Sequence, residues 1–271
     1  MSATTTQAPF APFEKWVWQV PSHFNIGVAC TDIHLGTSAE SSIAMIVEDD
    51  TLGTSEITFA GLSKRTHQFA QLLRNIGIAS GERVLIRLPN SLDYPTAFLG
   101  AMKRGAISVP TSTLLTADEV VYLAKDSGAR VLVTDKAAWK TLREGLNGVA
   151  GLTHVLLSGE GECLPADGLE VLDLASSLEA IKTWDAPHKT KSDDPAYLVY
   201  TSGTTGYPKG VLHAHRSMIG RQPASQYWFD FSPNGDRIMH SGKFNWTYVL
   251  GTGLMDPLYQ GKTVIVHEGK N

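Results

Sequence analysis

The sequence has little cysteine and no long apolar run. Its 271 residues contain two cysteines, Cys30 and Cys163, without a Cys-x-x-Cys spacing. This scarcity favours free thiols in a reducing compartment, so we expect a cytoplasmic protein. No apolar run approaches the ~20 residues that a membrane-spanning helix needs. Residues 1–10 have neither a charged segment nor an apolar core, and they contain no arginine, so neither a secretory signal nor a mitochondrial transit peptide is expected.

Positive charge is also in short supply. Lysine and arginine together number 23 against 27 aspartates and glutamates, which gives a formal net charge of -4. Because no basic stripe stands out, nucleic acid is not an expected partner. An anionic ligand would have to be held by local donors, since the overall charge of the protein does not attract it. The 42% of hydrophobic residues is ordinary for a soluble globular domain.

Short apolar runs alternate with helical periodicity along the middle of the chain. Strands are expected at 84–88, 105–110, 130–134, 154–158 and 196–200, and helices at 59–76, 92–103, 137–146 and 172–181, with a further helix that begins at the Thr116–Glu119 capping-box pattern. Such alternation builds right-handed βαβ units. We therefore predict an α/β fold with mainly parallel sheets covered by helices.

The remaining segments are less regular. Strands are expected at 42–48 and 57–59, as a hairpin, and at 237–240 and 263–267, with helices at 24–35, from 211 onward and at 217–228. The aromatic-rich residues 13–21 either pack on the body of the domain or contact another subunit. A homodimer therefore stays open as an interpretation.

The loop from Tyr200 to Gly210 concentrates groups that bind phosphate. It follows the expected strand 196–200 and contains two glycines and several hydroxyl residues before Lys209. Glycines let the backbone approach an anion, and hydroxyls, backbone N–H groups and a lysine supply donors and charge. In parallel sheets ligands bind at the carboxyl ends of strands, where this loop lies. The spacing of Gly206, Lys209 and Gly210 does not fit a Walker A motif, and no Gly-x-Gly-x-x-Gly fingerprint is present.

The loop resembles the signature of the adenylate-forming superfamily, which includes acyl-CoA synthetases, adenylation domains and luciferases. That signature reads Ser/Thr-Ser/Gly-Gly-Ser/Thr-Thr-Gly-x-Pro-Lys-Gly. Every fixed position is matched here, by Thr201, Ser202, Gly203, Thr204, Thr205, Gly206, Pro208, Lys209 and Gly210. Residues 57–62, 81–84 and 102–110 resemble further family elements, and residues 13–25 look most like the opening of short- and medium-chain acyl-CoA synthetases.

This resemblance covers nearly the whole chain but only the first half of the family's length. It implies that residues 1–271 form a partial N-terminal AMP-binding domain, an incomplete layered αβαβα arrangement. A first α/β subdomain with the phosphate loop is expected at about 60–220, and the start of a second sheet at about 40–59 plus 230–271. The C-terminal domain of the family is expected to be absent from this sequence.

The resemblance also implies a reaction. Family members use ATP and Mg²⁺ to convert a small carboxylic acid into an acyl-adenylate, and many then transfer the acyl group to coenzyme A. By resemblance, Thr201, Ser202, Gly203, Thr204 and Thr205 would wrap the phosphates and Gly206 would permit the turn. Lys209 would be the catalytic contact to phosphate. Mg²⁺ usually keeps several waters, so no protein cage and no metal-ligating residue is expected.

Four further positions are candidates with two interpretations each. His215 lies either near the bound nucleotide or in a purely structural place. Trp246 belongs either to the acyl pocket or to the core, and Gly251 and Gly253 either let a pocket wall come close or let helices pack. The family often has a Phe-His pair near Trp246, and the Asn245 found here leaves the acid open.

Several later motifs of the family do not occur in the sequence, among them the adenine-binding Tyr-Gly-x-Thr-Glu and the late catalytic lysine. We therefore expect the isolated chain to be inactive in adenylation. A carrier-protein-loading adenylation domain and a truncated, non-catalytic ATP-binding protein are the alternatives to an acyl-CoA synthetase.

Overall fold

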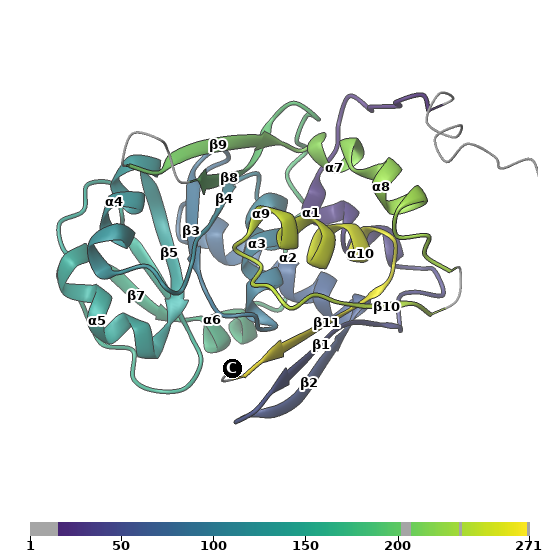
Figure 1. Cartoon of the computed structure of the whole chain (residues 1–271). Helices are drawn as coiled ribbons and strands as arrows, with labels where there is room; N and C mark the ends of the chain where they lie inside the picture. The colour runs from purple at the N-terminus through teal and green to yellow at the C-terminus, as the bar shows by residue number, and fades with distance from the viewer. Residues whose placement is uncertain (1–15, 202–206, 233–234, 270–271) are drawn as a thin grey trace, which may run out of the picture.

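The structure is a computed structural model and describes residues 16–201, 207–232 and 235–269. Its larger sheet has seven strands in the order β7-β6-β5-β3-β4-β8-β9 (Figure 1). The strands are β3 (Arg83–Arg87), β4 (Ile107–Pro110), β5 (Ala129–Asp135), β6 (His154–Ser158), β7 (Glu170–Asp173), β8 (Pro195–Thr201) and β9 (Lys209–Ala214). All neighbours are parallel except β8 and β9, which form an antiparallel pair at the edge.

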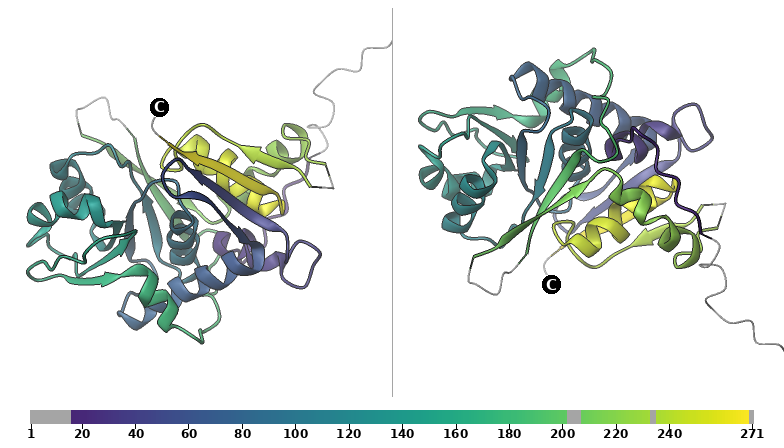
Figure 2. Two further views of the ribbon diagram at one scale, coloured as in Figure 1. Left: turned by 90° about the horizontal axis from the view of Figure 1, so that it is seen from below. Right: turned by 90° about the horizontal axis from the view of Figure 1, so that it is seen from above.

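The smaller sheet joins segments from both ends of the chain (Figure 2). The hairpin of β1 (Ile43–Asp49) and β2 (Gly53–Thr58) supplies its early strands. Next to β1 runs β11 (Thr263–Glu268) in parallel, and β10 (Arg237–Met239) is parallel to β11. The division of the chain into two subdomains stays a prediction, but these strands lie in the ranges given to the second one.

Helices cover both faces of the larger sheet (Figure 1). On one face lie α2 (Phe59–Asn75), α3 (Asp93–Lys103) and α6 (Leu174–Ala180), and on the other α4 (Ala117–Ser127) and α5 (Lys136–Leu146). Side chains alternate along β3: Val84 and Ile86 join the core that α2 and α3 share with the smaller sheet, and Leu85 joins the core under α4 and α5. The predicted α/β fold with mainly parallel sheets covered by helices is confirmed.

One predicted helix is a strand. Residues 211–215 were expected to be helical, but β9 continues through Ala214 and pairs antiparallel with β8. Val211 lies opposite Val199 and Leu212 opposite Leu198, so the open edge of β8 takes up the backbone hydrogen bonds of this segment. The apolar run at 211–212 suits either structure in isolation, and pairing with β8 decides between them.

Other helices are shorter than predicted or divided. The segment 24–35 contains only α1 (Ile26–Ala29) and a 3₁₀ turn, η2 (Asp32–His34), and residues 170–173 extend the sheet as β7 before α6 begins. The helix expected at 217–228 is divided into α7 (Ser217–Gly220) and α8 (Gln222–Tyr227), where Gly220 and Pro223 interrupt a single helix. The glycine-rich segment 247–259 forms α9 (Thr247–Val249), a π-helical segment η3 (Leu250–Met255) and α10 (Asp256–Tyr259).

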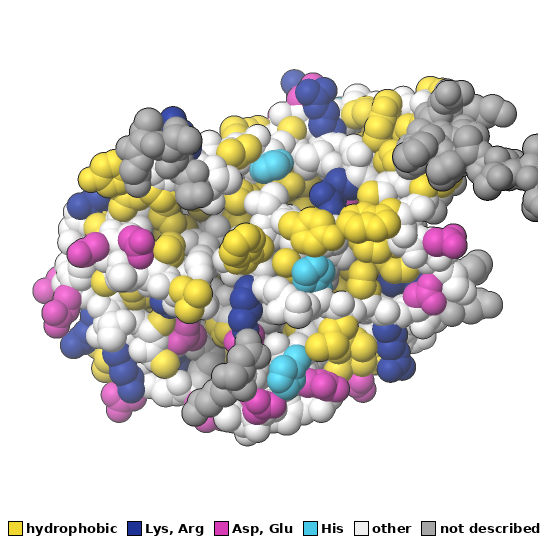
Figure 3. All heavy atoms as spheres, viewed as in Figure 1, with side chains coloured by type: hydrophobic (Ala, Val, Ile, Leu, Met, Phe, Trp, Pro, Cys, Tyr) yellow, Lys and Arg dark blue, Asp and Glu magenta, His cyan; other side chains and the backbone are white. Residues whose placement is uncertain are grey.

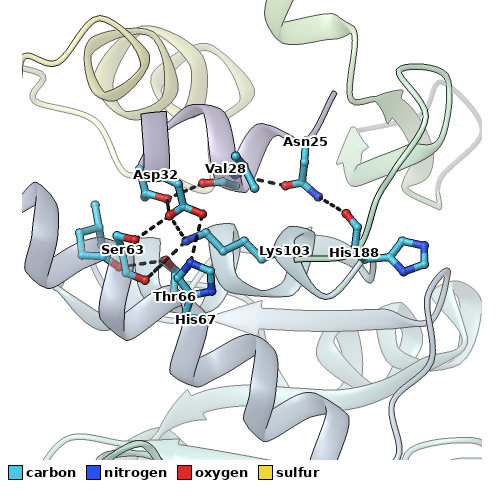
Figure 4. Close-up of polar contacts among 11 residues, drawn as sticks. Asn25, Val28, Asp32, Ser63, Thr66, His67, Lys103 and His188 are labelled. Carbon is cyan, nitrogen blue, oxygen red and sulfur yellow. Dashed lines mark hydrogen bonds and ion pairs between the residues drawn. The ribbon is translucent and has the colours of Figure 1, made fainter. Parts of the chain in front are cut away.

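A buried polar cluster ties three elements of the middle layer together (Figure 4). Asp32, on η2, accepts hydrogen bonds from Lys103 of α3 at 2.5 Å and from Ser63 of α2 at 2.6 Å. Its other oxygen lies 3.1 Å from Nε2 of His67, also on α2. We call Asp32, Ser63, His67 and Lys103 the Asp32 cluster. This cluster accounts for the 3₁₀ turn η2 after the end of α1, because the Asp32 carboxylate turns toward the ammonium group of Lys103.

Candidate functional site

A cavity opens at the carboxyl ends of β4 and β8, which are neighbours in the larger sheet. Its volume is about 520 Å³. Its walls come from the segment after β4, from one face of α4 and from the residues on both sides of the loop between β8 and β9. The lining residues are Pro110, Thr111, Ser112, Leu115, Asp118, Glu119, Tyr122, Leu123, Tyr200, Thr201, Tyr207, Pro208 and Asn245. The sheet thus presents a hollow where the carboxyl-end rule for ligand sites places one.

The two described ends of the loop face each other at this cavity. Thr201 is the last residue of β8 and Lys209 the first of β9, and the two are partners in the strand register. The Thr201 hydroxyl donates to the Lys209 carbonyl at 3.5 Å, and both residues are exposed. The other predicted phosphate-binding residues, Ser202, Gly203, Thr204, Thr205 and Gly206, lie outside the described residues.

A second cavity, of about 430 Å³, adjoins the first. The two share Ser112, Tyr200, Thr201 and Asn245 as lining residues, and the second adds Trp246. The Trp246 side chain is 68% exposed, so it is not a core residue. On the face shown in Figure 3, large hydrophobic side chains gather over the region of α9 and α10. Thr201 therefore lines both cavities, and Trp246 lines the second of them.

Asn90 holds the segment that carries Asn245 and Trp246, a role that was not predicted from the sequence. Its buried amide oxygen accepts from the Phe244 backbone N–H at 3.0 Å, and its amide nitrogen donates to the Gly242 carbonyl at 3.2 Å. Asn90 follows β3, whereas its partners come from a segment far along the chain. The Pro89–Asn90 pair could be recognised as the end of a strand, but nothing in the local pattern shows which segment it binds.

The charges at the cavity are arranged unevenly. Asp118 and Glu119 stand in the first turn of α4, where the Glu119 carboxylate accepts from the backbone and hydroxyl of Thr116 as the capping box predicted. These hydrogen bonds hold the pKa of Glu119 below its usual value. The lining residues include no lysine or arginine, and Lys209 stands beside the lining residue Pro208. The positive charge next to a polyanion bound in this cavity would therefore come from Lys209 and from cations that bind together with the polyanion.

His215 is not brought to the cavity. Strand β9 runs away from the loop, and Ala214, just before His215, lies opposite Pro195 at the other end of β8. There the Ile26 backbone N–H donates to Nδ1 of the buried His215 at 3.1 Å. Burial lowers the pKa of His215 to about 4. These contacts support the structural interpretation of His215 rather than a nucleotide contact.

Gly251 and Gly253 lie inside η3 and line neither cavity. Next to Gly251, the Arg221 guanidinium forms a bidentate ion pair with the carboxylate of the buried Asp256. Its Nε donates to Oδ1 at 2.9 Å and its Nη2 to Oδ2 at 2.7 Å. A Cβ at Gly251 would collide with that guanidinium, and one at Gly253 would come within 3.1 Å of His240 and Val249. Both glycines therefore serve close packing in this structure.

Gly251→Ala is expected to lower the free energy of unfolding by about 1 kcal/mol, because the new methyl group overpacks the Arg221–Asp256 pair. We expect a value at the low end of the usual cost of overpacking, because the end of the Arg221 side chain can shift. Urea denaturation measures it. The matched control is Gly220→Ala, also in a helix, where a Cβ meets nothing within 4 Å. Equal stabilities of the two variants would contradict the packing role.

Within residues 16–201, 207–232 and 235–269, no group of three or more His, Cys, Asp or Glu side chains is placed to hold a metal ion. In the same part of the chain, no helix is long and apolar enough to cross a membrane.

These features define an α/β domain with a glycine- and hydroxyl-rich loop at a sheet's carboxyl edge, the class to which adenylate-forming enzymes belong. Residues 38–271 match the family model described as AMP-binding enzyme. The chain belongs to this family.

Relatives and solved structures agree with this assignment. A 3-hydroxybenzoate–CoA/4-hydroxybenzoate–CoA ligase of Thauera aromatica is 33% identical over 221 residues, covering 79% of this chain and 40% of that protein. A benzoate–CoA ligase of the same organism is 33% identical over 211 residues, covering 77% and 38%. The crystal structure of the anthranilate CoA ligase AuaEII in complex with anthranoyl-AMP matches with a TM-score of 0.78 at 27% identity, covering 91% of this chain and 45% of that one. The chain thus spans about 40% of the length of the curated relatives.

Proposed function

We propose that this chain is the part of an ATP-dependent CoA ligase that holds the phosphates of ATP. The complete reaction joins a carboxylic acid to AMP as an acyl-adenylate, releases pyrophosphate, and then forms a thioester with coenzyme A. The observation that supports this most is the position of the signature loop. Its described ends, Thr201 and Lys209, meet at the carboxyl edge of β8 beside a 520 Å³ cavity.

In this reaction the protein aligns the reactants and stabilises charge, and it supplies no nucleophile of its own. The substrate carboxylate attacks the α-phosphorus itself, and the protein must align it and stabilise the charge of the departing pyrophosphate. Lys209 and the Thr201 hydroxyl lie where they could donate to phosphate oxygens. Mg²⁺ bound to the nucleotide would share the remaining charge, which suits a hollow whose side chains include Asp118 and Glu119.

We also propose that the acid is small and aromatic. Trp246 offers an exposed ring at the 430 Å³ cavity, which adjoins the phosphate end of the site. Two of the relatives are named for benzoate or hydroxybenzoate, which supports the choice. Titration with a non-hydrolysable benzoyl-adenylate analogue and with its hexadecanoyl counterpart tests it. Tighter binding of the hexadecanoyl compound would contradict the proposed acid class.

Lys209→Ala is expected to weaken binding of magnesium pyrophosphate and of ATP about fivefold, because one charge-assisted contact to phosphate is lost. Isothermal titration calorimetry on the 271-residue chain measures both affinities. Lys140→Ala, which removes an exposed lysine from α5, is the control and should leave both unchanged. A chain that binds neither compound would refute the proposed function. Binding that is insensitive to Lys209 would refute the role of this lysine.

A further inference from the structure

One face of α4 contacts both sides of the loop between β8 and β9. Tyr122 and Asp126 are four residues apart on this helix and therefore lie on the same face, one turn from each other. Asp126 reaches the entrance of the loop, where its carboxylate accepts a hydrogen bond from the Tyr200 hydroxyl at 2.6 Å. Tyr200 directly precedes Thr201. Burial and the nearby Asp126 both raise the pKa of Tyr200, so this hydroxyl keeps its proton and stays a donor.

Tyr122 reaches the exit of the loop. Its ring stacks on that of Tyr207, with centroids 5.1 Å apart and planes 26° from parallel. Its hydroxyl donates to the Pro208 carbonyl at 3.3 Å. Tyr207 is 69% exposed even with this stack in place. Pro208 and Tyr207 directly precede Lys209.

Strand pairing supports β9 from the side of β8. β9 is the outer strand of the sheet, and its first residues, Lys209 to Leu212, are exposed. The contacts from α4 add a second support outside the sheet, one on each side of the loop. Tyr122, Tyr200, Tyr207 and Pro208 also line the 520 Å³ cavity, so the support and the proposed phosphate site share one wall.

We propose that Tyr122 and Asp126 are positioning residues, which hold the two flanks of the loop so that the Thr201 hydroxyl and the Lys209 ammonium group face a bound polyphosphate. The inference rests on the proposed function and deepens it. Each acts through the flank that it holds, and the gain in affinity comes from order that exists before the ligand binds.

A purely structural role for the same contacts makes a different prediction. If Tyr122 and Asp126 only stabilised α4, their variants would melt earlier but bind phosphate normally once folded. Affinity measured well below the melting temperature of each variant separates the two roles. A conservative variant separates them further, because Asp126→Asn keeps an oxygen that accepts from Tyr200, whereas Asp126→Ala does not.

The test is the affinity of the 271-residue chain for magnesium pyrophosphate and for ATP, measured by calorimetry. Tyr122→Phe loses the hydrogen bond to Pro208 and is expected to bind about threefold more weakly. Tyr122→Leu loses the stack as well and is expected to bind about tenfold more weakly. Asp126→Ala should lose about threefold, and Asp126→Asn should recover most of that loss.

Tyr94→Phe is the matched control for the change of tyrosine to phenylalanine. The Tyr94 hydroxyl is buried without a hydrogen-bond partner among the described residues, and its removal should leave affinity unchanged. Wild-type affinity in a folded Tyr122→Leu protein, or equal losses in Asp126→Asn and Asp126→Ala, would overturn the positioning role alone. Failure of the unchanged chain to bind either compound would overturn the proposed function and this role with it.

Discussion

Lys103→Met is expected to lower the free energy of unfolding by about 3 kcal/mol. The Lys103 side chain is fully buried, and its Nζ lies 2.5 Å from Oδ1 of Asp32. Methionine fills similar space but leaves the carboxylate without its cation, and breaking a buried ion pair on one side typically costs 3–5 kcal/mol. The lower end applies because the Asp32 side chain is still 17% exposed and keeps its hydrogen bonds to Ser63 and His67.

The protonation states of the pair agree with this expectation. Burial lowers the pKa of Lys103 to about 8, although Asp32 opposes the shift, so the lysine is largely charged near neutral pH. Burial would raise the pKa of Asp32, but the contacts with His67 and Lys103 outweigh it and hold the carboxyl well below its usual range. Both partners are therefore charged in the folded protein, and removal of the Lys103 ammonium group leaves the negative charge of Asp32 without its partner.

Urea denaturation at pH 7 measures the effect, with Lys64→Met as the control on the exposed side of α2. The double variant Asp32→Asn/Lys103→Met should recover part of the loss, because the uncompensated charge is gone. If Lys103→Met and Lys64→Met were equally stable, the Asp32 cluster would not contribute to the stability of the fold.

The elements that the sequence predicted well are those whose apolar pattern is contained within the element itself. The helix at 59–76 buries Phe59, Leu62 and Phe69 along one stripe, and the strand at 154–158 matches β6 in both bounds. The helix follows from one apolar stripe, and the strand from a short apolar run that is buried on both faces, with Leu156 in one core and Val155 and Leu157 in the other. The capping box at Thr116 is local in the same sense, and it also formed.

The errors fall where a distant segment decides the structure. The run at 211–215 becomes a strand because β8 offers an open edge, and η2 forms where Asp32 meets Lys103 from α3. Because β9 runs antiparallel to β8, His215 lies near the start of β8 and away from the loop.

The candidate site divides in the same way. The carboxyl-end rule and the signature loop predicted a site at the end of β8, where Thr201 lines a cavity and pairs with Lys209 in the strand register. Asn90 and Tyr122 could not be found from sequence, because each acts on a segment far along the chain and belongs to no motif. Gly251 had two interpretations from sequence, a pocket wall or close helix packing, and in the structure the Arg221 guanidinium occupies the space next to it.

His215 should make the protein less stable in mild acid. In the unfolded chain a histidine has a pKa of about 6.5, whereas burial holds that of folded His215 at about 4. Between these values the unfolded state binds the proton and the folded state does not, so stability falls as the pH decreases. From pH 7 to pH 5 this one group should remove about 2 kcal/mol, because pH 5 lies about 1.5 units below the unfolded pKa.

The measurement is urea denaturation at pH 7, 6 and 5 for the wild type and for His215→Gln, whose amide does not titrate. His34 and His213 also have pKa values lowered by burial, so both proteins should lose stability in acid, and only the difference between them reports His215. Asp194, which acts to raise the pKa of His215, and His188, which acts to lower it, are present in both proteins. The stability of His215→Gln relative to the wild type should therefore rise by about 2 kcal/mol between pH 7 and pH 5. If the two proteins lost the same stability between pH 7 and pH 5, the pKa of His215 would be the same in the folded and unfolded states, and the expected burial effect would be contradicted.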